Sequence, residues 1–254
     1  MGSLGRRPAP HPPRGAVVRW HVRGHDDTVN RVLLLRHGEC RTNLTKEFSC
    51  RHVDHPLTAK GGLQARQTAR ALAVEPVTAV FCSPLLRAVE TAEAVAGVHG
   101  LPVHVVDEFR ELDVGDLEGR TPTVDLWEEF ETVLDAWRDG DAHARFPGGE
   151  DQRELCERMG RGLRLALAGR RDETVIVVTH GGILTWTAPA WCPSVDLESL
   201  LLRDQPNCAI TEVDFDANGV GTIVRWASHG HLSGDAADLV PGTPQPGELP
   251  RRDG

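Results

Sequence analysis

Residues 31–43, "RVLLLRHGECRTN", combine a buried strand and a group of polar side chains in one short stretch. Val32 to Leu35 form an unbroken aliphatic run, which is typical of a parallel strand covered on both faces. This run passes directly into Arg36, His37 and Gly38 without a polar turn. Because open parallel sheets bind ligands beyond the carboxyl ends of their strands, the pattern indicates a ligand site at this end.

A second stretch, "ETVIVVTHGG" at residues 173–182, repeats the same design. Here an apolar run ends in His180, and Gly181 and Gly182 follow. Two strands of this kind would bring two imidazoles face to face, and the glycines would let a ligand approach the backbone closely. A single histidine at a strand end is more often structural, whereas a matched pair favours function. We therefore expect His37 and His180 to share one site.

The other segments alternate between strand-like and helix-like patterns, which predicts an α/β fold. Strands are expected at 31–36, 77–83, 101–106 and 173–180, helices at 57–73, 83–97, 121–139 and 150–169, and a hairpin at 207–229. Thr58 and Ser83 are expected helix N-caps, Gly97 an expected helix end, and Asn218-Gly219 the hairpin turn. The predicted architecture is a three-layer α/β/α sandwich with a mainly parallel central sheet.

The composition of the two ends differs from that of the middle. Residues 1–29 are rich in Pro, Arg, Gly and His, and residues 232–254 are rich in Pro and Gly. Such segments bury little apolar surface, so we expect disordered extensions on either side of one domain at 30–231. Within that domain, the acidic segment 121–149 reads as a helical insertion. It either packs its tryptophans on the body or forms a lid over the site.

The overall charge and composition exclude several functions. A formal net charge of −9 argues against nucleic acid or an anionic membrane surface as a partner. The chain has no apolar run of about 18 residues, and its start has no hydrophobic signal region. Six scattered cysteines without a C-x-x-C pair fit a reducing cytoplasm. The closely spaced histidine pairs match no metal-ligand spacing, so no metal site is expected. The sequence indicates no particular oligomeric state.

Arg87 adds a second cation to the predicted site. It lies early in the helix "SPLLRAVETA", and helical side chains lean toward the N-terminus, where free N–H groups favour an anion. Arg36 and Arg87 together would supply two fork-shaped donors, the geometry that grips a phosphate. The competing interpretation is a surface arginine paired with Glu90, its i,i+3 neighbour.

Six stretches carry a resemblance to a known family: "LLLRHGECRTN", "DHPLTAKGGLQA", "CSPLLRAVETA", "RELDVGDLEG", "FPGGED" and "VVTHGG". They resemble, in order, the successive motifs of the histidine phosphatase superfamily in its phosphoglycerate-mutase-like branch, branch 1. Together they cover residues 31–185. The resemblance implies a phosphoglycerate-mutase-like fold and phosphoryl chemistry that needs neither a metal nor a cofactor.

The resemblance also implies roles for individual residues. His37 would be the nucleophile that forms a phosphohistidine, and Glu111 would be the general acid that protonates the leaving group. Glu111 is singled out from its acidic neighbours by the motif alone. The groups expected to bind the phosphate are Arg36, Asn43, Arg87, His180 and Gly181. Of these, Arg36, Arg87 and His180 would also be catalytic, because they would stabilise the charge that spreads in the transition state.

Two departures from the family pattern bear on the reaction. Cys40 stands where the family usually has Ser or Thr, which we interpret as a tolerated small residue. After Glu111 the chain continues Leu112-Asp113-Val114, without the basic residues with which mutases hold a second acidic group. This favours hydrolysis over phosphoryl return.

We therefore predict a metal-independent phosphomonoester hydrolase that acts through a phosphohistidine. The expected substrate is a small phosphorylated metabolite: a sugar, cyclitol, nucleoside or specialised-metabolite phosphate. A lid at 121–149, being acidic, would disfavour polyanionic substrates. The alternatives are a phosphoglycerate-mutase-type phosphoryl transferase and a non-catalytic module that binds a phosphorylated ligand.

Overall fold

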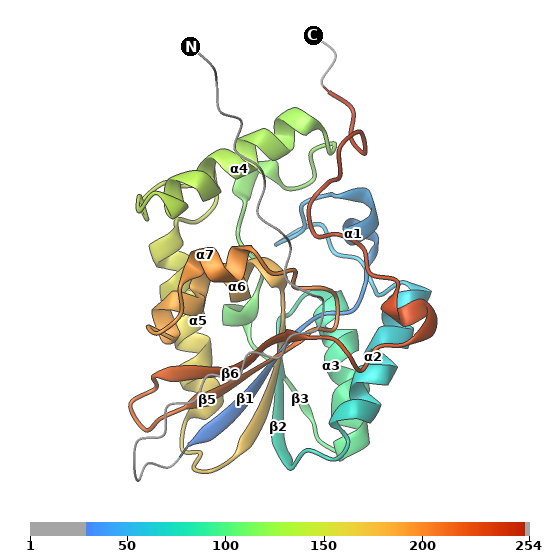
Figure 1. The fold of residues 1–254 in the computed structure, drawn as a ribbon, viewed down its shortest axis with the longest axis vertical. Helices are drawn as coiled ribbons and strands as arrows, with labels where there is room; N and C mark the ends of the chain where they lie inside the picture. Colours follow the sequence, from blue (N-terminus) through green and yellow to red (C-terminus); the bar gives the residue numbers. More distant parts are fainter. Residues whose placement is uncertain (1–28, 252–254) are drawn as a thin grey trace, which may run out of the picture.

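The computed structural model describes residues 29–251, and within them one mixed sheet forms the centre of the molecule (Figure 1). Its strands are β1 (Asn30–Arg36), β2 (Val77–Cys82), β3 (Val103–Val105), β4 (Thr174–Thr179), β5 (Ile210–Phe215) and β6 (Gly221–Ser228). They lie in the order β3-β2-β4-β1-β5-β6. The first four strands are mutually parallel, and β5 and β6 add an antiparallel hairpin at one edge.

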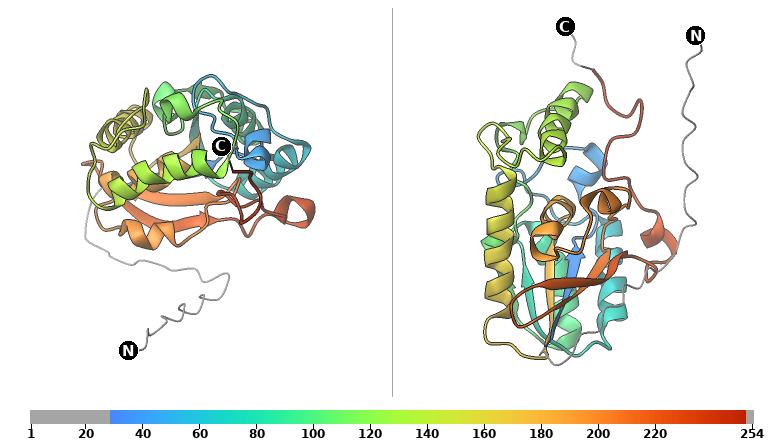
Figure 2. Two further views of the ribbon diagram at one scale, coloured as in Figure 1. Left: turned by 90° about the horizontal axis from the view of Figure 1, so that it is seen from above. Right: turned by 60° about the vertical axis from the view of Figure 1, so that its left-hand side comes forward.

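Helices cover both faces of this sheet, with α2 (Ala59–Leu72) and α3 (Leu86–His99) on one side and α5 (Gln152–Leu167) and α6 (Gly181–Trp191) on the other (Figures 1 and 2). Helix α4 (Val124–Arg138) lies beyond the carboxyl ends of the parallel strands. The shorter elements are α1 (Arg41–Thr45), α7 (Leu197–Leu201) and the 3-10 turns η1 (Asp107–Phe109), η2 (Gly115–Leu117) and η3 (Gly234–Ala237). This is the three-layer α/β/α architecture that the sequence predicts.

The aliphatic run of β1 explains why helices cover both faces of the sheet. Successive side chains of a strand point to opposite faces, so Val32 and Leu34 enter the core beneath α5 and α6. Leu33 and Leu35 enter the core beneath α2 and α3. Each of these side chains is almost fully buried, and burial of one such side chain contributes about 1.5–3 kcal/mol. The strand is therefore held from both sides, and its carboxyl end is fixed in position.

The predicted helix ends are right in one case and wrong in another. Thr58 caps α2 as predicted, because its Oγ1 accepts the N–H of Gly61 at 3.0 Å. Helix α3 instead begins at Leu86, whose N–H is bound by the distant Asp54 carboxylate at 2.9 Å, and it ends at Gly100 in the left-handed region with φ 65°. Ser83 is not its cap. The predicted hairpin is present, and Gly219 takes φ 79° at its turn.

The insertion at 121–149 packs on the body through its tryptophans. The Trp127 ring contacts Phe48 at 4.8 Å between centroids, and its Nε1 donates to the carbonyl of Lys46 at 3.1 Å. Trp137 is buried, donates to the carbonyl of Ala144 and meets Trp186 edge-on. The insertion thus packs its tryptophans on the main core, as one of the two alternatives predicts, and α4 lies beyond the strand ends (Figure 1).

The C-terminal segment differs from its expectation as a disordered tail. Residues 232–251 lie against α2 and α4, with Leu232 buried and the Ala236 carbonyl accepting from Gln64 Nε2 at 3.1 Å. The Val124 N–H donates to the carbonyl of Pro250 at 2.9 Å. The expectation of disorder was based on the small apolar surface of the segment. The contacts that hold the segment are instead made largely by its backbone carbonyls, which composition does not indicate. Residues 1–28 and 252–254, also expected to be disordered, lie outside the described residues.

Candidate active site

The two strand-end histidines meet beyond the carboxyl end of the sheet. Strands β1 and β4 are parallel neighbours, with Arg36 opposite Thr179, and the His37 N–H donates to the Thr179 carbonyl at 3.0 Å. The register therefore places His37 beside His180. Their ring centroids are 5.1 Å apart, and both side chains are buried.

The hydrogen bonds of His37 assign its tautomer. Nδ1 lies 2.7 Å from the Gly38 carbonyl oxygen, which can only accept, so Nδ1 carries the proton. Nε2 is then unprotonated, and its lone pair accepts the N–H of Arg87 Nε at 3.1 Å. Burial, together with Arg87 and Arg36, holds the pKa of His37 well below its ordinary value. The ring is therefore neutral near pH 7, as a nucleophile requires.

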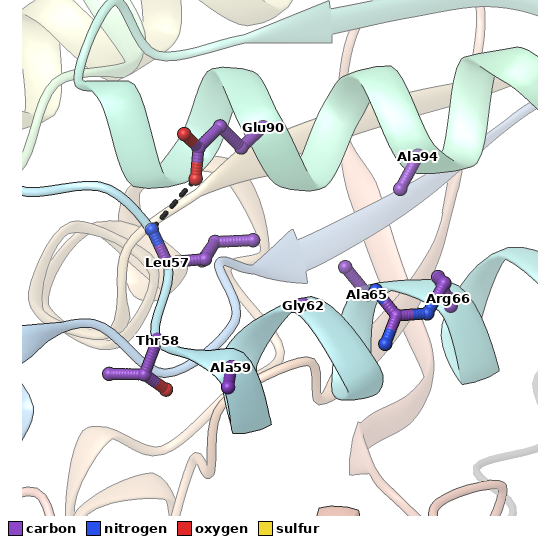
Figure 3. A pocket seen from close by; sticks show the side chains of 8 residues that line it. All are labelled: Leu57, Thr58, Ala59, Gly62, Ala65, Arg66, Glu90 and Ala94. Carbon is purple, nitrogen blue, oxygen red and sulfur yellow. Dashed lines mark hydrogen bonds between the residues drawn. The ribbon is translucent and has the colours of Figure 1, made fainter.

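Arg87 points into the site and does not pair with Glu90. Its side chain is 3% exposed, and its two terminal nitrogens donate to Ser49 Oγ and the Ser49 carbonyl at 2.8 and 2.9 Å. Glu90 instead accepts the Leu57 N–H at 2.7 Å, where α2 and α3 approach (Figure 3). The surface ion pair that competed with a site role is therefore not formed.

A second group of polar atoms surrounds Arg36. Its Nη1 donates to the Gln205 carbonyl at 2.5 Å, while its Nε is buried without a partner among the described residues. The side-chain amide atoms of Gln205 and Nδ1 of His180 are buried and unpartnered in the same sense. A Cβ on Gly181 would lie 3.4 Å from Arg36 Nε and 3.5 Å from Gln205 Oε1, so these groups adjoin. Buried polar groups normally have partners, and such a group of exceptions is typical of a ligand site.

His180 is oriented by Ser83. The Ser83 Oγ accepts the Leu85 N–H at 3.3 Å and lies 2.7 Å from His180 Nε2. If Ser83 donates its hydroxyl proton to Nε2, the ring proton of His180 resides on Nδ1, the unpartnered atom. Burial, followed by the charge of Arg87, lowers the pKa of His180 well below its ordinary value. The ring is thus neutral near pH 7, and in this tautomer its Nδ1 is a donor. Sequence reasoning assigned Ser83 to a helix cap instead.

Glu111 lies at the N-terminus of α6, in the loop between η1 and η2. Its carboxylate accepts the Gly182 N–H at 3.1 Å and the Ile183 N–H at 2.8 Å. This approach requires a glycine, because a Cβ at Gly182 would stand 2.8 Å from Glu111 Oε1 and 2.6 Å from Leu112 Cδ1. The carboxylate is therefore brought to the edge of the site that carries His180 and Gly181.

Arg158, which sequence reasoning missed, secures the backbone of this loop. It donates to the carbonyls of Glu108, Arg110 and Glu111 at 2.9, 2.8 and 3.2 Å. Its charge is balanced by Glu150, at 2.6 and 3.1 Å, in the "FPGGED" stretch. An arginine within an amphipathic helix carries no sequence signal that distinguishes such a role from an exposed position.

Asn43 belongs to the network behind His37. Its Oδ1 accepts from the Cys40 N–H at 3.0 Å and from Asn207 Nδ2 at 3.1 Å, and Asn207 Nδ2 also reaches the His37 carbonyl at 3.0 Å. The predicted site residues are thus gathered from β1, α1, α3, α6 and the loop of Glu111. Asn207 joins them from the segment before β5 and was not predicted.

Other features of the described chain lie apart from this site. A groove of about 520 Å³ between α2 and α3 is lined by residues such as Leu57, Arg66 and Ala94, and none of its lining residues is a predicted site residue (Figure 3). Within residues 29–251, no three His, Cys, Asp or Glu side chains gather closely enough to hold a metal ion. In that same range, no helix combines the length and apolar character needed to cross a membrane.

Comparison with known proteins places this geometry in a family. The model of the histidine phosphatase superfamily, branch 1, matches residues 32–229. The Salmonella choleraesuis (strain SC-B67) protein named "Probable phosphoglycerate mutase GpmB" is 32% identical over 218 residues, 82% of this chain and 93% of its own. The alpha-ribazole phosphatase of Shigella flexneri is 28% identical, with TM-score 0.64 over 80% of this chain and 99% of that one. YhfR of Bacillus stearothermophilus is 25% identical, with TM-score 0.69 over 80% and 100%. The chain belongs to branch 1 of the histidine phosphatase superfamily.

Proposed function

We propose that this protein hydrolyses a small phosphomonoester through a phosphohistidine on Nε2 of His37. The observation that carries the proposal is the arrangement around that atom: a neutral ring, an unprotonated Nε2, and buried donors from Arg36, Arg87 and His180 nearby. Two guanidiniums and one N–H group can donate to the oxygens of the phosphoryl group in the transition state, because its negative charge is spread over those oxygens.

In the first step, the Nε2 lone pair forms a bond to phosphorus while the ester P–O bond breaks. Glu111, protonated at this stage, gives its proton to the departing alkoxide. In the second step, the Glu111 carboxylate takes a proton from water as the water oxygen attacks phosphorus. The N–P bond then breaks, inorganic phosphate leaves, and His37 and the protonated Glu111 are restored. General acid–base assistance of this kind contributes about 10²–10⁴-fold in rate.

Hydrolysis is favoured over phosphoryl transfer by the chemistry after Glu111. Leu112 and Val114 are buried, and Asp113 contributes a carboxylate, so this run offers no cation to a second acidic group. The name of the Shigella relative supports a phosphatase, whereas the name of the Salmonella relative supports the mutase alternative. We infer a substrate with a single phosphate on a sugar, cyclitol, nucleoside or specialised metabolite, with α4 as the lid above it.

We place the enzyme in the cytoplasm. All six cysteines are free thiols, and burial raises the pKa of Cys50, Cys82 and Cys208 to about 12. Protonated, enclosed thiols of this kind suit a reducing compartment and take no part in the proposed chemistry.

The test is phosphate release from a panel of phosphomonoesters by the wild type, His37→Ala and Glu111→Gln. We expect His37→Ala to lose about a thousandfold or more with every ester, since the nucleophile is absent. His104→Ala, which removes an exposed histidine on β3, is the matched control and should behave as wild type. Quenching in alkaline denaturant during turnover should trap a phosphoenzyme in the wild type and none in His37→Ala, and later acid treatment should release its phosphate.

Three outcomes would contradict the proposal. Turnover that persists in His37→Ala excludes this nucleophile. Phosphate binding without release from any ester favours a non-catalytic binding module. Isomerisation of a phosphoglycerate without phosphate release favours the mutase.

A further inference from the structure

A strap formed by residues 232–251 runs from α2, past α1, to the start of α4 (Figures 1 and 2). At one end, the backbone of Ser233 exchanges hydrogen bonds with the Gln67 amide, and Lys60 Nζ donates to the Asp238 carbonyl at 2.9 Å. At the other end, the Pro250 carbonyl accepts the Val124 N–H at 2.9 Å. The strap is therefore tied down on both sides of the segment that follows the catalytic strand.

Between these ties the strap covers a buried cation, Lys46. The Lys46 side chain is 2% exposed, and its Nζ donates to the carbonyls of Asn43 at 3.0 Å and Pro241 at 2.7 Å. Glu248 Oε1 lies 3.8 Å from the same nitrogen. An ammonium has three N–H donors, and within residues 29–251 the strap supplies two of the three polar groups described for Nζ, the Pro241 carbonyl and the Glu248 carboxylate.

The Glu248 carboxylate is held in place for this contact. Its Oε2 accepts the Gln245 N–H at 2.7 Å, and the Glu248 N–H donates to the Gln245 carbonyl at 2.9 Å, closing a tight turn. Oε1 is left facing Lys46. The strap thus presents a carboxylate to the ammonium in a fixed geometry.

Lys46 borders the proposed phosphate site. It binds the carbonyl of Asn43, whose side chain belongs to the His37 network, and its own carbonyl is bound by Trp127 of the lid helix. Burial lowers the pKa of Lys46, Glu248 opposes this, and the positive charge of Arg36 lowers it further. Lys46 is therefore joined by hydrogen bonds both to the segment of Asn43 and to α4.

We propose that the Lys46–Glu248 pair is a specificity determinant, in which the strap supplies the carboxylate that Lys46 would otherwise take from a substrate. Because Glu248 balances the charge of Lys46, the site discriminates against phosphomonoesters that carry a second acidic group. It accepts those whose alcohol part is uncharged. This rests on the proposed hydrolase function, and it assigns a cause of selectivity to the strap in addition to the acidic lid helix.

The test compares two probes that differ in one group. Glycerol 3-phosphate ends in a neutral hydroxymethyl group where 3-phosphoglycerate carries a carboxylate, and the phosphate esters are otherwise alike. We expect the wild type to favour glycerol 3-phosphate in kcat/KM. Glu248→Gln should raise kcat/KM for 3-phosphoglycerate about tenfold, the scale of one charge-assisted hydrogen bond, and change glycerol 3-phosphate less than about twofold.

Two further variants make the result specific to Lys46. Adding Lys46→Met to Glu248→Gln should abolish the gain with 3-phosphoglycerate, and thermal unfolding should verify that the double variant is folded. Asp235→Asn removes the same charge from an exposed position on the strap and should leave both probes unchanged.

The outcomes separate this inference from the proposed function. A wild type that prefers 3-phosphoglycerate overturns the inference, as does a Glu248→Gln effect that is absent, equal for both probes, or reproduced by Asp235→Asn. Such results leave hydrolysis intact. Failure of the wild type to release phosphate from either probe or from the wider panel refutes the hydrolase itself.

Discussion

Gly182→Ala is the perturbation that tests most directly how the fold positions the general acid. The added Cβ would lie 2.8 Å from Glu111 Oε1, whereas ordinary contact begins at 3.4 Å, so the carboxylate must retreat by about 0.6 Å. The added Cβ would also lie 2.6 Å from Leu112 Cδ1, so both Leu112 and Glu111 must move away from it. The substitution therefore displaces Glu111 and leaves the donors to the phosphate in place.

The size of the effect depends on the leaving group. A misplacement of about 1 Å costs about a hundredfold in rate, so we expect kcat with an alkyl phosphate to fall by about tenfold to a hundredfold. The p-nitrophenolate ion leaves without needing a proton, so kcat with p-nitrophenyl phosphate should fall less than about threefold. KM should stay nearly constant for both, because the proposed phosphate ligands Arg36 and Arg87 are untouched.

The assay is steady-state phosphate release with both esters by wild type, Gly182→Ala, Glu111→Gln and the double variant. If Gly182 acts through Glu111, the double variant should be no slower than Glu111→Gln. Gly97→Ala is the matched control, since this helical glycine has nothing within 4 Å of its Cβ position. It should keep full activity and gain about 1 kcal/mol in stability. Equal losses with both esters, or additive losses in the double variant, would refute the reasoning.

Two other expectations concern stability. The buried rings of His37 and His180 have pKa values well below the ordinary one, chiefly through burial, so below about pH 6.5 the unfolded chain takes up protons that the folded chain does not. Urea unfolding should show stability falling between pH 6.5 and 5.5, by up to about 1.4 kcal/mol per ring, and a flat profile would disprove this. Arg158→Met should lower the unfolding free energy by about 3–5 kcal/mol, because it leaves the Glu150 carboxylate without its counter-charge. Adding Glu150→Gln to the same chain should restore part of that free energy. A loss below about 1 kcal/mol would show that the pair is dispensable.

The central strands could be predicted because their signal is local. An unbroken aliphatic run has no stable place except between two layers, so β1 and β4 fall within one residue of their expected bounds. Their parallel pairing then brings His37 and His180 together with no further information. The outer elements were harder. Helix α6 was missed because Gly181-Gly182 resembles a turn, yet its first N–H groups are capped by Glu111 from a remote loop.

The site residues that sequence reasoning missed share one property: their partners are far away in the chain. Ser83 contacts His180, Gln205 adjoins Arg36 and Gly181, and Arg158 binds the loop of Glu111. None of these pairings leaves a trace in spacing or composition. The expected disordered tail was misjudged for the same reason, since its anchors lie on α2, α1 and α4.

Residue order alone therefore establishes the layered fold and the identity of the polar groups at the strand ends, because both follow from side-chain alternation and strand polarity. The tertiary structure was needed to show that Arg87 turns inward, which nitrogen of His37 is free, how Gly182 admits Glu111, and where the strap lies over Lys46. These depend on contacts between segments that meet only when the sheet has formed. A pattern within one segment cannot encode the distance to another.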